Sequence, residues 1–195
     1  MPAGASLTKP PAARPQRLFF ALWPDKEAAR ALHHAGRELQ VACGGRLTRL
    51  ATVHLTLVFL GEVAPEKIPQ LERAAASVRA EAFSINFNRY GWWKHNRIVW
   101  AMPEETPPPL RRLVHGLETA LEQQGISCDK RPYVPHVTLL RKAERRPRID
   151  GLPGAAWAAR EFVLVRSVLD REGADYEVIG RWSLGEEAES PSPSS

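Results

Sequence analysis

Cysteine is scarce in this chain of 195 residues, where Cys43 and Cys128 are the two present. They lie far apart, and neither has a second cysteine or a histidine beside it at the spacing of metal ligands. A disulfide framework and a zinc site both need such clustering. The sequence therefore predicts neither, and we expect two reduced thiols and a cytoplasmic location.

Long apolar runs are also missing. The longest run near the start, Leu18 to Trp23, is closed by Arg17 and Pro24 and falls short of the roughly 20 residues that a membrane span needs. We expect neither a membrane span nor a signal peptide. Aspartates such as Asp129 and Asp175 are scattered through turn-like segments, so no carboxylate cluster suits magnesium. The sequence predicts no metal and no cofactor.

Basic residues outnumber acidic ones, 27 to 22, which gives a net charge of +5 and a pI near 9.6. This balance favours a polyanionic partner. The length and the 44% of hydrophobic residues fit one globular domain. Residues 1–16 are rich in Pro, Ala and Gly, and residues 186–195 in Glu, Ser and Pro. We predict two disordered tails around a single domain at 17–185.

Between the predicted tails, strand and helix patterns follow one another irregularly. The spacing of apolar residues predicts helices after Asp25, from Pro65 and from Pro107. Strand patterns lie at 17–23, 83–87, 98–101, 162–169 and 176–184. Because the order lacks a regular β-α-β alternation, it favours antiparallel or mixed sheets with helices packed on one side. We predict an α+β fold.

One short pattern occurs twice, as HLTLVF starting at His54 and as HVTLLR starting at His136. The two histidines lie 136 − 54 = 82 positions apart. Residues two apart in a strand share a face, so each histidine points the same way as its threonine, Thr56 or Thr138. The apolar residues between them point into a core. A single His-x-Thr means little, but two in strand-like segments indicate a paired site.

Two histidines suit a reaction that moves two protons. When water opens a cyclic phosphodiester, one group takes a proton from water and another protonates the leaving ribose oxygen. An unperturbed imidazole pKa of about 6.5 allows one histidine to be neutral while the other is charged. Each threonine hydroxyl can donate to a phosphate oxygen on the same face. Such a site needs no metal.

These residues resemble the paired motifs of the two-histidine phosphoesterase superfamily, specifically its RNA 2′,3′-cyclic phosphodiesterases, also called 2′-5′ RNA ligases. Arg17–Pro24 (RLFFALWP) resembles the family's opening strand, His54–Glu62 (HLTLVFLGE) its first motif, and Arg131–Arg141 (RPYVPHVTLLR) its second. The likeness covers roughly residues 17–184. It implies a bilobal, pseudo-twofold pair of α+β lobes, each of which gives one His-x-Thr strand to a central groove.

The resemblance also implies roles in the hydrolysis of a cyclic phosphate to a 2′-phosphate. His54 is the expected general acid at the O3′ leaving group, and His136 is the expected base that activates water. Thr56 and Thr138 are expected to hold the non-bridging oxygens, and Arg141 to pair with the phosphate.

Arg141 reaches the phosphate only if its strand is irregular. By strict alternation it lies on the face opposite His136, so the strand must end, twist or bulge near Leu140. The first motif has Phe59 at the equivalent place, so the two halves are not interchangeable. A basic run beyond the second motif is expected to attract RNA. Its members are Lys142, Arg145, Arg146 and Arg148.

Single-stranded RNA is commonly held by stacking on aromatic rings. Tyr133, which lies shortly before His136, is the predicted candidate for stacking on a base. The other four histidines have no threonine at the matching offset and are interpreted as surface or structural residues. They are His33, His34, His95 and His115.

The expected partner is RNA that ends in a 2′,3′-cyclic phosphate, such as a tRNA fragment, bound by a monomer. Two alternatives stay open: a phosphodiesterase acting on another cyclic or 2′-5′-linked nucleotide, and a noncatalytic RNA-binding module on the same fold. A pure binder is free to lose a histidine, so the presence of both His-x-Thr pairs favours catalysis. The same phosphoryl transfer in reverse is 2′-5′ ligation, which also stays open.

Overall fold

The computed structural model describes residues 14–129, 131–147, 154–170 and 173–185. The strands are β1 (Gln16–Leu22), β2 (Arg46–Leu47), β3 (Leu55–Val63), β4 (Phe83–Trp93), β5 (Ile98–Pro103), β6 (Val137–Arg141), β7 (Ala155–Ala159), β8 (Glu161–Asp170) and β9 (Gly173–Ser183). The α-helices are α1 (Lys26–Cys43), α2 (Ile68–Ser77) and α3 (Pro108–Gln123), with 3₁₀ turns η1 (Leu50–Thr52) and η2 (Pro65–Lys67).

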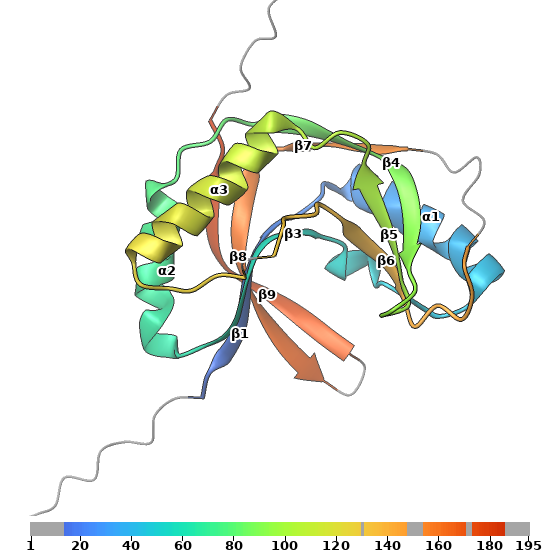
Figure 1. The fold of residues 1–195 in the computed structure, drawn as a ribbon, viewed down its shortest axis with the longest axis horizontal. Helices are drawn as coiled ribbons and strands as arrows, with labels where there is room; N and C mark the ends of the chain where they lie inside the picture. The colour runs from blue at the N-terminus through green and yellow to red at the C-terminus, as the bar shows by residue number, and fades with distance from the viewer. Residues whose placement is uncertain (1–13, 130, 148–153, 171–172, 186–195) are drawn as a thin grey trace, which may run out of the picture.

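The nine strands form one curled antiparallel sheet in the order β7-β4-β5-β6-β3-β1-β8-β9, with β2 paired to β6. The sheet narrows at its centre, where β3 and β6 meet through a single pair of residues, Leu55 and Val137. This junction separates a first lobe (β1, β3, β8, β9, α2, α3) from a second lobe (β2, β4, β5, β6, β7, α1). Figure 1 shows α2 and α3 of the first lobe on one side of the molecule and α1 of the second lobe on the other. The predicted α+β fold with two lobes is confirmed.

Each lobe is covered by one helix that follows a strand of the other lobe. Helix α1 follows β1 of the first lobe but packs against β6 and β7 of the second. Helix α3 follows β5 of the second lobe but packs against α2 and β3 of the first. In the order of its elements the chain crosses between the lobes six times, and one continuous set of buried side chains links them.

Helix α1 forms for the reasons that its sequence predicts. The Asp25 carboxylate accepts a hydrogen bond from the backbone N–H of Ala28 at 2.8 Å, which caps the first turn. Leu32 and Leu39 are buried along the apolar face. In the last turn Ala42 is exposed and Cys43 is buried. The glycine that follows ends the helix with a positive φ.

A β-bulge interrupts both strands of the repeated motif at the same place. In the pairing of β3 with β1, Leu57 is the extra residue between two paired positions, and in the pairing of β6 with β5 the extra residue is Leu139. Each bulge makes two successive residues point into the core, as the buried pair Leu139 and Leu140 shows. Arg141 therefore returns to the face of Thr138, and the irregularity expected near Leu140 is confirmed.

In the described part of the chain, no helix is long and apolar enough to cross a membrane. The residues predicted as tails, 1–16 and 186–195, lie outside the described residues except for 14–16. Strand β1 begins at Gln16, one residue before the predicted start of the domain.

Replacing Gly45 by alanine is expected to lower the free energy of unfolding by about 2 to 5 kcal/mol. Gly45 has φ +91°, and an added Cβ would lie 2.8 Å from the Arg141 carbonyl oxygen. Gly125→Ala is the matched control, because Gly125 has φ +71° and nothing within 4 Å of an added Cβ. It should cost only the backbone strain, about 1 to 2 kcal/mol. Equal losses for the two variants in urea denaturation would contradict the predicted clash with the β6 backbone.

Candidate active site

The junction between the lobes brings the two motifs together. His54 and His136 immediately precede Leu55 and Val137, the pair that joins β3 to β6. Because these strands are antiparallel, His54 lies toward Thr138, and His136 lies toward Thr56. Each histidine is therefore set toward the threonine of the other motif.

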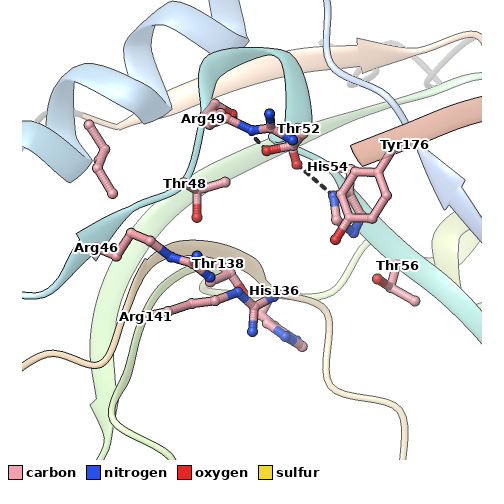
Figure 2. Close-up of a pocket in the computed structure, with 11 residues that line it drawn as sticks. Arg46, Thr48, Arg49, Thr52, His54, Thr56, His136, Thr138, Arg141 and Tyr176 are labelled. Atoms are coloured by element: carbon pink, nitrogen blue, oxygen red, sulfur yellow. Dashed lines mark hydrogen bonds between the residues drawn. The ribbon is translucent and has the colours of Figure 1, made fainter. Parts of the chain in front are cut away.

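Both histidines line one cavity of about 150 Å³ between the lobes. Figure 2 shows the side chains around it, with His54 and Tyr176 on one side and His136, Thr138 and Arg141 on the other. Five of the six residues predicted for the site lie here: His54, Thr56, His136, Thr138 and Arg141. The other lining residues are Arg46, Leu47, Thr48, Arg49, Thr52 and Tyr176.

The backbone fixes the same tautomer in both histidines. The Nδ1 atom of His54 lies 2.8 Å from the Thr52 carbonyl oxygen, and that of His136 lies 2.9 Å from the Val134 carbonyl oxygen. A carbonyl oxygen only accepts hydrogen bonds, so each Nδ1 carries the hydrogen and donates it. In both motifs the acceptor is two residues before the histidine, and Nε2 is the ring nitrogen left for a ligand.

Aromatic rings pack closely around His54. Trp23 stacks on the imidazole with ring centres 5.4 Å apart, while Phe19 and Tyr176 each lie 5.1 Å away. Burial disfavours the charged form and lowers the pKa of His54 to about 4, and the charges of Arg141 and His136 lower it further against the opposing Thr52 hydrogen bond. In the free protein His54 is therefore neutral at pH 7.

Fewer aromatic rings surround His136 than His54. The Trp93 ring meets it edge-on, with centres 4.7 Å apart. Burial and the nearby guanidinium of Arg141 lower the pKa of His136 below its ordinary value, although the hydrogen bond to Val134 acts in the opposite direction. Both imidazoles of the free site are thus set to be neutral near pH 7, and a bound anion would favour their protonation.

Three arginines give the cavity a strong positive charge. Arg46 and Arg141 are cross-strand partners in the pairing of β2 with β6, an arrangement that is unfavourable for like charges. Arg49 pairs with Asp175 at 3.3 Å, but no carboxylate belongs to the lining. A bound anion between the guanidinium groups would relieve the repulsion, so the cavity suits a phosphate.

Several lining residues escape prediction from the sequence. Arg46 and Arg49 precede His54 by eight and five residues, and their basic character before the motif is a weak local signal. Thr48 lines the cavity, and its hydroxyl oxygen is buried without a hydrogen-bond partner among the described residues. Tyr176 comes from β9, 122 positions beyond His54 (176 − 54 = 122). Nothing in the sequence near Tyr176 indicates that it lies beside that ring.

Tyr133 lies outside the lining of the cavity. Its ring packs against the buried core, and its hydroxyl donates a hydrogen bond to the Thr56 carbonyl oxygen at 3.2 Å. Tyr133 precedes the second motif and Thr56 belongs to the first, so this contact ties the two motifs together.

Among the residues that the structure describes, no three His, Cys, Asp or Glu side chains gather into a group that could hold a metal ion. The polar side chains around the cavity are arginines, threonines, two histidines and a tyrosine. Guanidinium groups repel cations, so this set of side chains fits an anion better than a metal.

Comparison with known proteins finds relatives that match most of the chain. The model of the LigT like Phosphoesterase family matches residues 22–100 and 101–174. The RNA 2′,3′-cyclic phosphodiesterase of Escherichia coli (strain K12) is 34% identical over 172 residues, which cover 87% of this chain and 97% of that protein. The protein of the same name from Thermus thermophilus is 32% identical over 178 residues, covering 86% and 90%.

Solved structures agree with the sequence matches. The crystal structure of Escherichia coli LigT in its apo form has a TM-score of 0.77 at 31% identity and covers 89% of this chain and 100% of that one. The structure of TT0787 from Thermus thermophilus has a TM-score of 0.72 at 27% identity, covering 88% and 99%. The family model spans most of the chain, and the relatives match nearly end to end. This chain belongs to the LigT-like phosphoesterase family.

Proposed function

We propose that this chain hydrolyses the 2′,3′-cyclic phosphate at an RNA end to a 2′-phosphate, with His54 and His136 as proton donor and acceptor. The observation that carries the proposal is the pair of imidazoles in one arginine-lined cavity, each with Nδ1 bonded to a backbone carbonyl. This arrangement leaves two Nε2 atoms for one phosphate group, which is what acid–base hydrolysis of a phosphodiester requires.

The relatives support this choice of substrate. Proteins from Escherichia coli, Thermus thermophilus and Archaeoglobus fulgidus that match most of this chain are named RNA 2′,3′-cyclic phosphodiesterases. Escherichia coli LigT has been crystallised with phosphate and with 3′-AMP. Both ligands carry the phosphate group for which the arginines of this cavity are suited.

The proton balance requires one donor and one acceptor, and the family resemblance assigns these roles to His54 and His136 respectively. His136 Nε2 accepts a proton from the attacking water, whose oxygen bonds to phosphorus, while the bond from phosphorus to O3′ breaks. Protonated His54 gives its Nε2 proton to O3′, which leaves a 3′-hydroxyl and a 2′-phosphate. Thr56 and Thr138 donate to the non-bridging oxygens, and Arg141 pairs with the charge that builds up on them.

The low pKa of His54 shapes this mechanism. A histidine with a pKa of about 4 is a strong proton donor when charged, but it is rarely charged at pH 7 in the free enzyme. The negative charge of the bound phosphate raises the pKa of both imidazoles, so substrate binding supplies the condition under which His54 holds its proton. The arginines supply the positive charge that a metal provides in other phosphoesterases, so we propose a metal-independent reaction.

The site supports one bilobal domain at 17–185 acting as a monomer. The first lobe contributes His54 and Thr56, and the second lobe contributes His136 and Arg141, so neither lobe holds a complete site. One chain supplies every residue that the reaction uses. Cys43 and Cys128 form no disulfide with each other, which is compatible with the reducing cytoplasm.

An RNA ending in a 2′,3′-cyclic phosphate is expected to be converted to the 2′-phosphate in the presence of EDTA. His54→Ala and His136→Ala should each lower kcat by about 10²- to 10⁴-fold, because each removes one of the two proton-transfer groups. His115→Ala, an exposed histidine on α3, is the control and should keep wild-type turnover. Strict dependence on added metal, or wild-type turnover by either site variant, would refute the mechanism.

The substrate class is tested by running the same assay on three substrates side by side. These are a short RNA with a cyclic phosphate end, a mononucleotide 2′,3′-cyclic phosphate, and 2′-5′-linked oligoadenylate. The first is expected to give the highest kcat/KM. Preferential cleavage of the 2′-5′ linkage would assign the chain to a different substrate class.

The pH dependence of kcat/KM is expected to be bell-shaped, with both limbs below pH 6.5, because the pKa of each histidine in the free enzyme is lowered. Activity needs His54 charged and His136 neutral. Because His54 has the lower pKa, this is the minor of the two singly protonated forms, but its fraction rises and falls with the same two limbs. As pH rises through the higher pKa both become neutral, and as pH falls through about 4 both become charged, so kcat/KM falls on each side.

The limbs of the kcat profile should lie at higher pH than those of the kcat/KM profile, because the bound phosphate anion raises the pKa of both histidines. Initial rates from pH 3.5 to 9 at low and at saturating substrate give the two profiles. An optimum of kcat/KM above pH 7 would contradict the lowered pKa of the two histidines in the free enzyme.

A further inference from the structure

A second, larger groove lies on the second lobe, over the β4–β5 hairpin and the segment that follows β6. Its volume is about 500 Å³. Three basic side chains line it, Arg89, Lys94 and Arg146, together with the indoles of Trp92 and Trp100. Arg89 and Lys94 belong to the β4–β5 hairpin and Arg146 to the segment after β6, so the fold brings two distant parts of the chain to one place.

The groove is electropositive. The side chains of Arg89, Lys94 and Arg146 are exposed, and no acidic residue belongs to the lining. Among the described residues, none of the three takes part in an ion pair with a carboxylate. Free cations around a groove of this size favour a ligand with several negative charges.

Trp100 gives the groove a flat aromatic floor. Its cross-strand partner on β4 is Gly91, and a Cβ added to Gly91 would lie 2.2 Å from Cζ2 of the indole. The absence of a side chain at Gly91 therefore lets the indole lie against the strand. Trp100 is half-buried and lines the groove, which places a π surface among the cations.

The groove adjoins the active site. Trp100 is also the cross-strand partner of Thr138, which lines the catalytic cavity. The Trp93 ring contacts both sides, with its centre 5.6 Å from that of Trp100 and 4.7 Å from that of His136. A ligand that extends from the catalytic cavity along the second lobe therefore enters the groove directly.

We propose that this groove binds the nucleotides on the 5′ side of the terminal cyclic phosphate, an inference that rests on the proposed function. The cyclic phosphate occupies both the O2′ and the O3′ of the last ribose, so the RNA chain continues only from the 5′ oxygen. Any neighbouring site therefore receives upstream nucleotides. A flat indole with cations around it matches single-stranded RNA, whose bases stack on aromatic rings and whose phosphates pair with basic side chains.

The test compares an RNA tetranucleotide with a mononucleotide, each ending in a 2′,3′-cyclic phosphate. In the double variant Arg89→Gln/Arg146→Gln, KM for the tetranucleotide is expected to rise about 5- to 10-fold, with kcat unchanged. KM and kcat for the mononucleotide should stay at wild-type values, because it is too short to reach the groove. The slope of log KM against log salt for the tetranucleotide should fall by about 1.4, since two phosphate contacts are lost.

The matched control is Arg30→Gln/Arg111→Gln, which removes the same charge from exposed positions on α1 and α3. It should leave KM for both substrates near the wild-type values. A rise in tetranucleotide KM as large as that of the groove variant would show a general charge effect and overturn the proposal. An equal rise for both substrates, or no rise in the groove variant, would do the same.

Failure of the proposed function has a separate signature, because the wild-type enzyme would then hydrolyse neither substrate. Binding read by fluorescence anisotropy, with a labelled tetranucleotide that already ends in a 2′-phosphate, measures the groove without catalysis. Weaker binding by the groove variant than by the control variant is the expected result. Equal binding by the two variants would overturn the proposal.

Discussion

The contact between Leu55 and Val137 is the constraint on which the site depends. It is the one pair of residues in register between β3 and β6, so the two lobes are joined at their narrowest point. The residue before each partner is a catalytic candidate, which means that the join between the lobes also sets the distance between the imidazoles. Helices α1 and α3 each follow a strand of one lobe and pack against the other lobe, so the chain links the two lobes at more places than this narrow join.

The matching bulges at Leu57 and Leu139 explain how three residues of one short motif lie on the same face of the sheet. An unbroken strand would set the histidine and threonine on one face and the fifth residue after the histidine on the other. One extra residue in each strand returns that fifth residue to the catalytic face. The buried pair that results, Leu139 with Leu140, anchors the bulge in the core, so the position of Arg141 is secured by apolar packing.

The sequence predicts the elements and motifs that short-range patterns determine. It does not predict the cavity residues that distant strands bring together. The His-x-Thr strings, the three α-helices and the α+β class follow from local patterns, and the family resemblance adds the two lobes. Arg46 enters the cavity because β2 pairs with β6, and Tyr176 because β8 of the β8–β9 hairpin pairs with β1. Those pairings span long stretches of chain, and no local signal announces them. Tyr133 lies close to His136 in sequence, yet its ring packs against the core and outside the lining of the cavity, so its stacking on a base stays a prediction.

The two halves of the site are related by pseudo-symmetry, and their differences give the substrate a direction. At the position equivalent to Arg141, the first motif has Phe59, which is exposed and lies under Arg17 with 4.8 Å between guanidinium carbon and ring centre. The positive charge is therefore concentrated on the His136 side. The aromatic rings are concentrated on the other side, around His54. A cyclic phosphate must be bound in one orientation, because only one of its two ribose–phosphate bonds is to be broken. Two identical half-sites would accept either orientation, whereas a cationic half and an aromatic half distinguish the phosphate oxygens from the nucleoside.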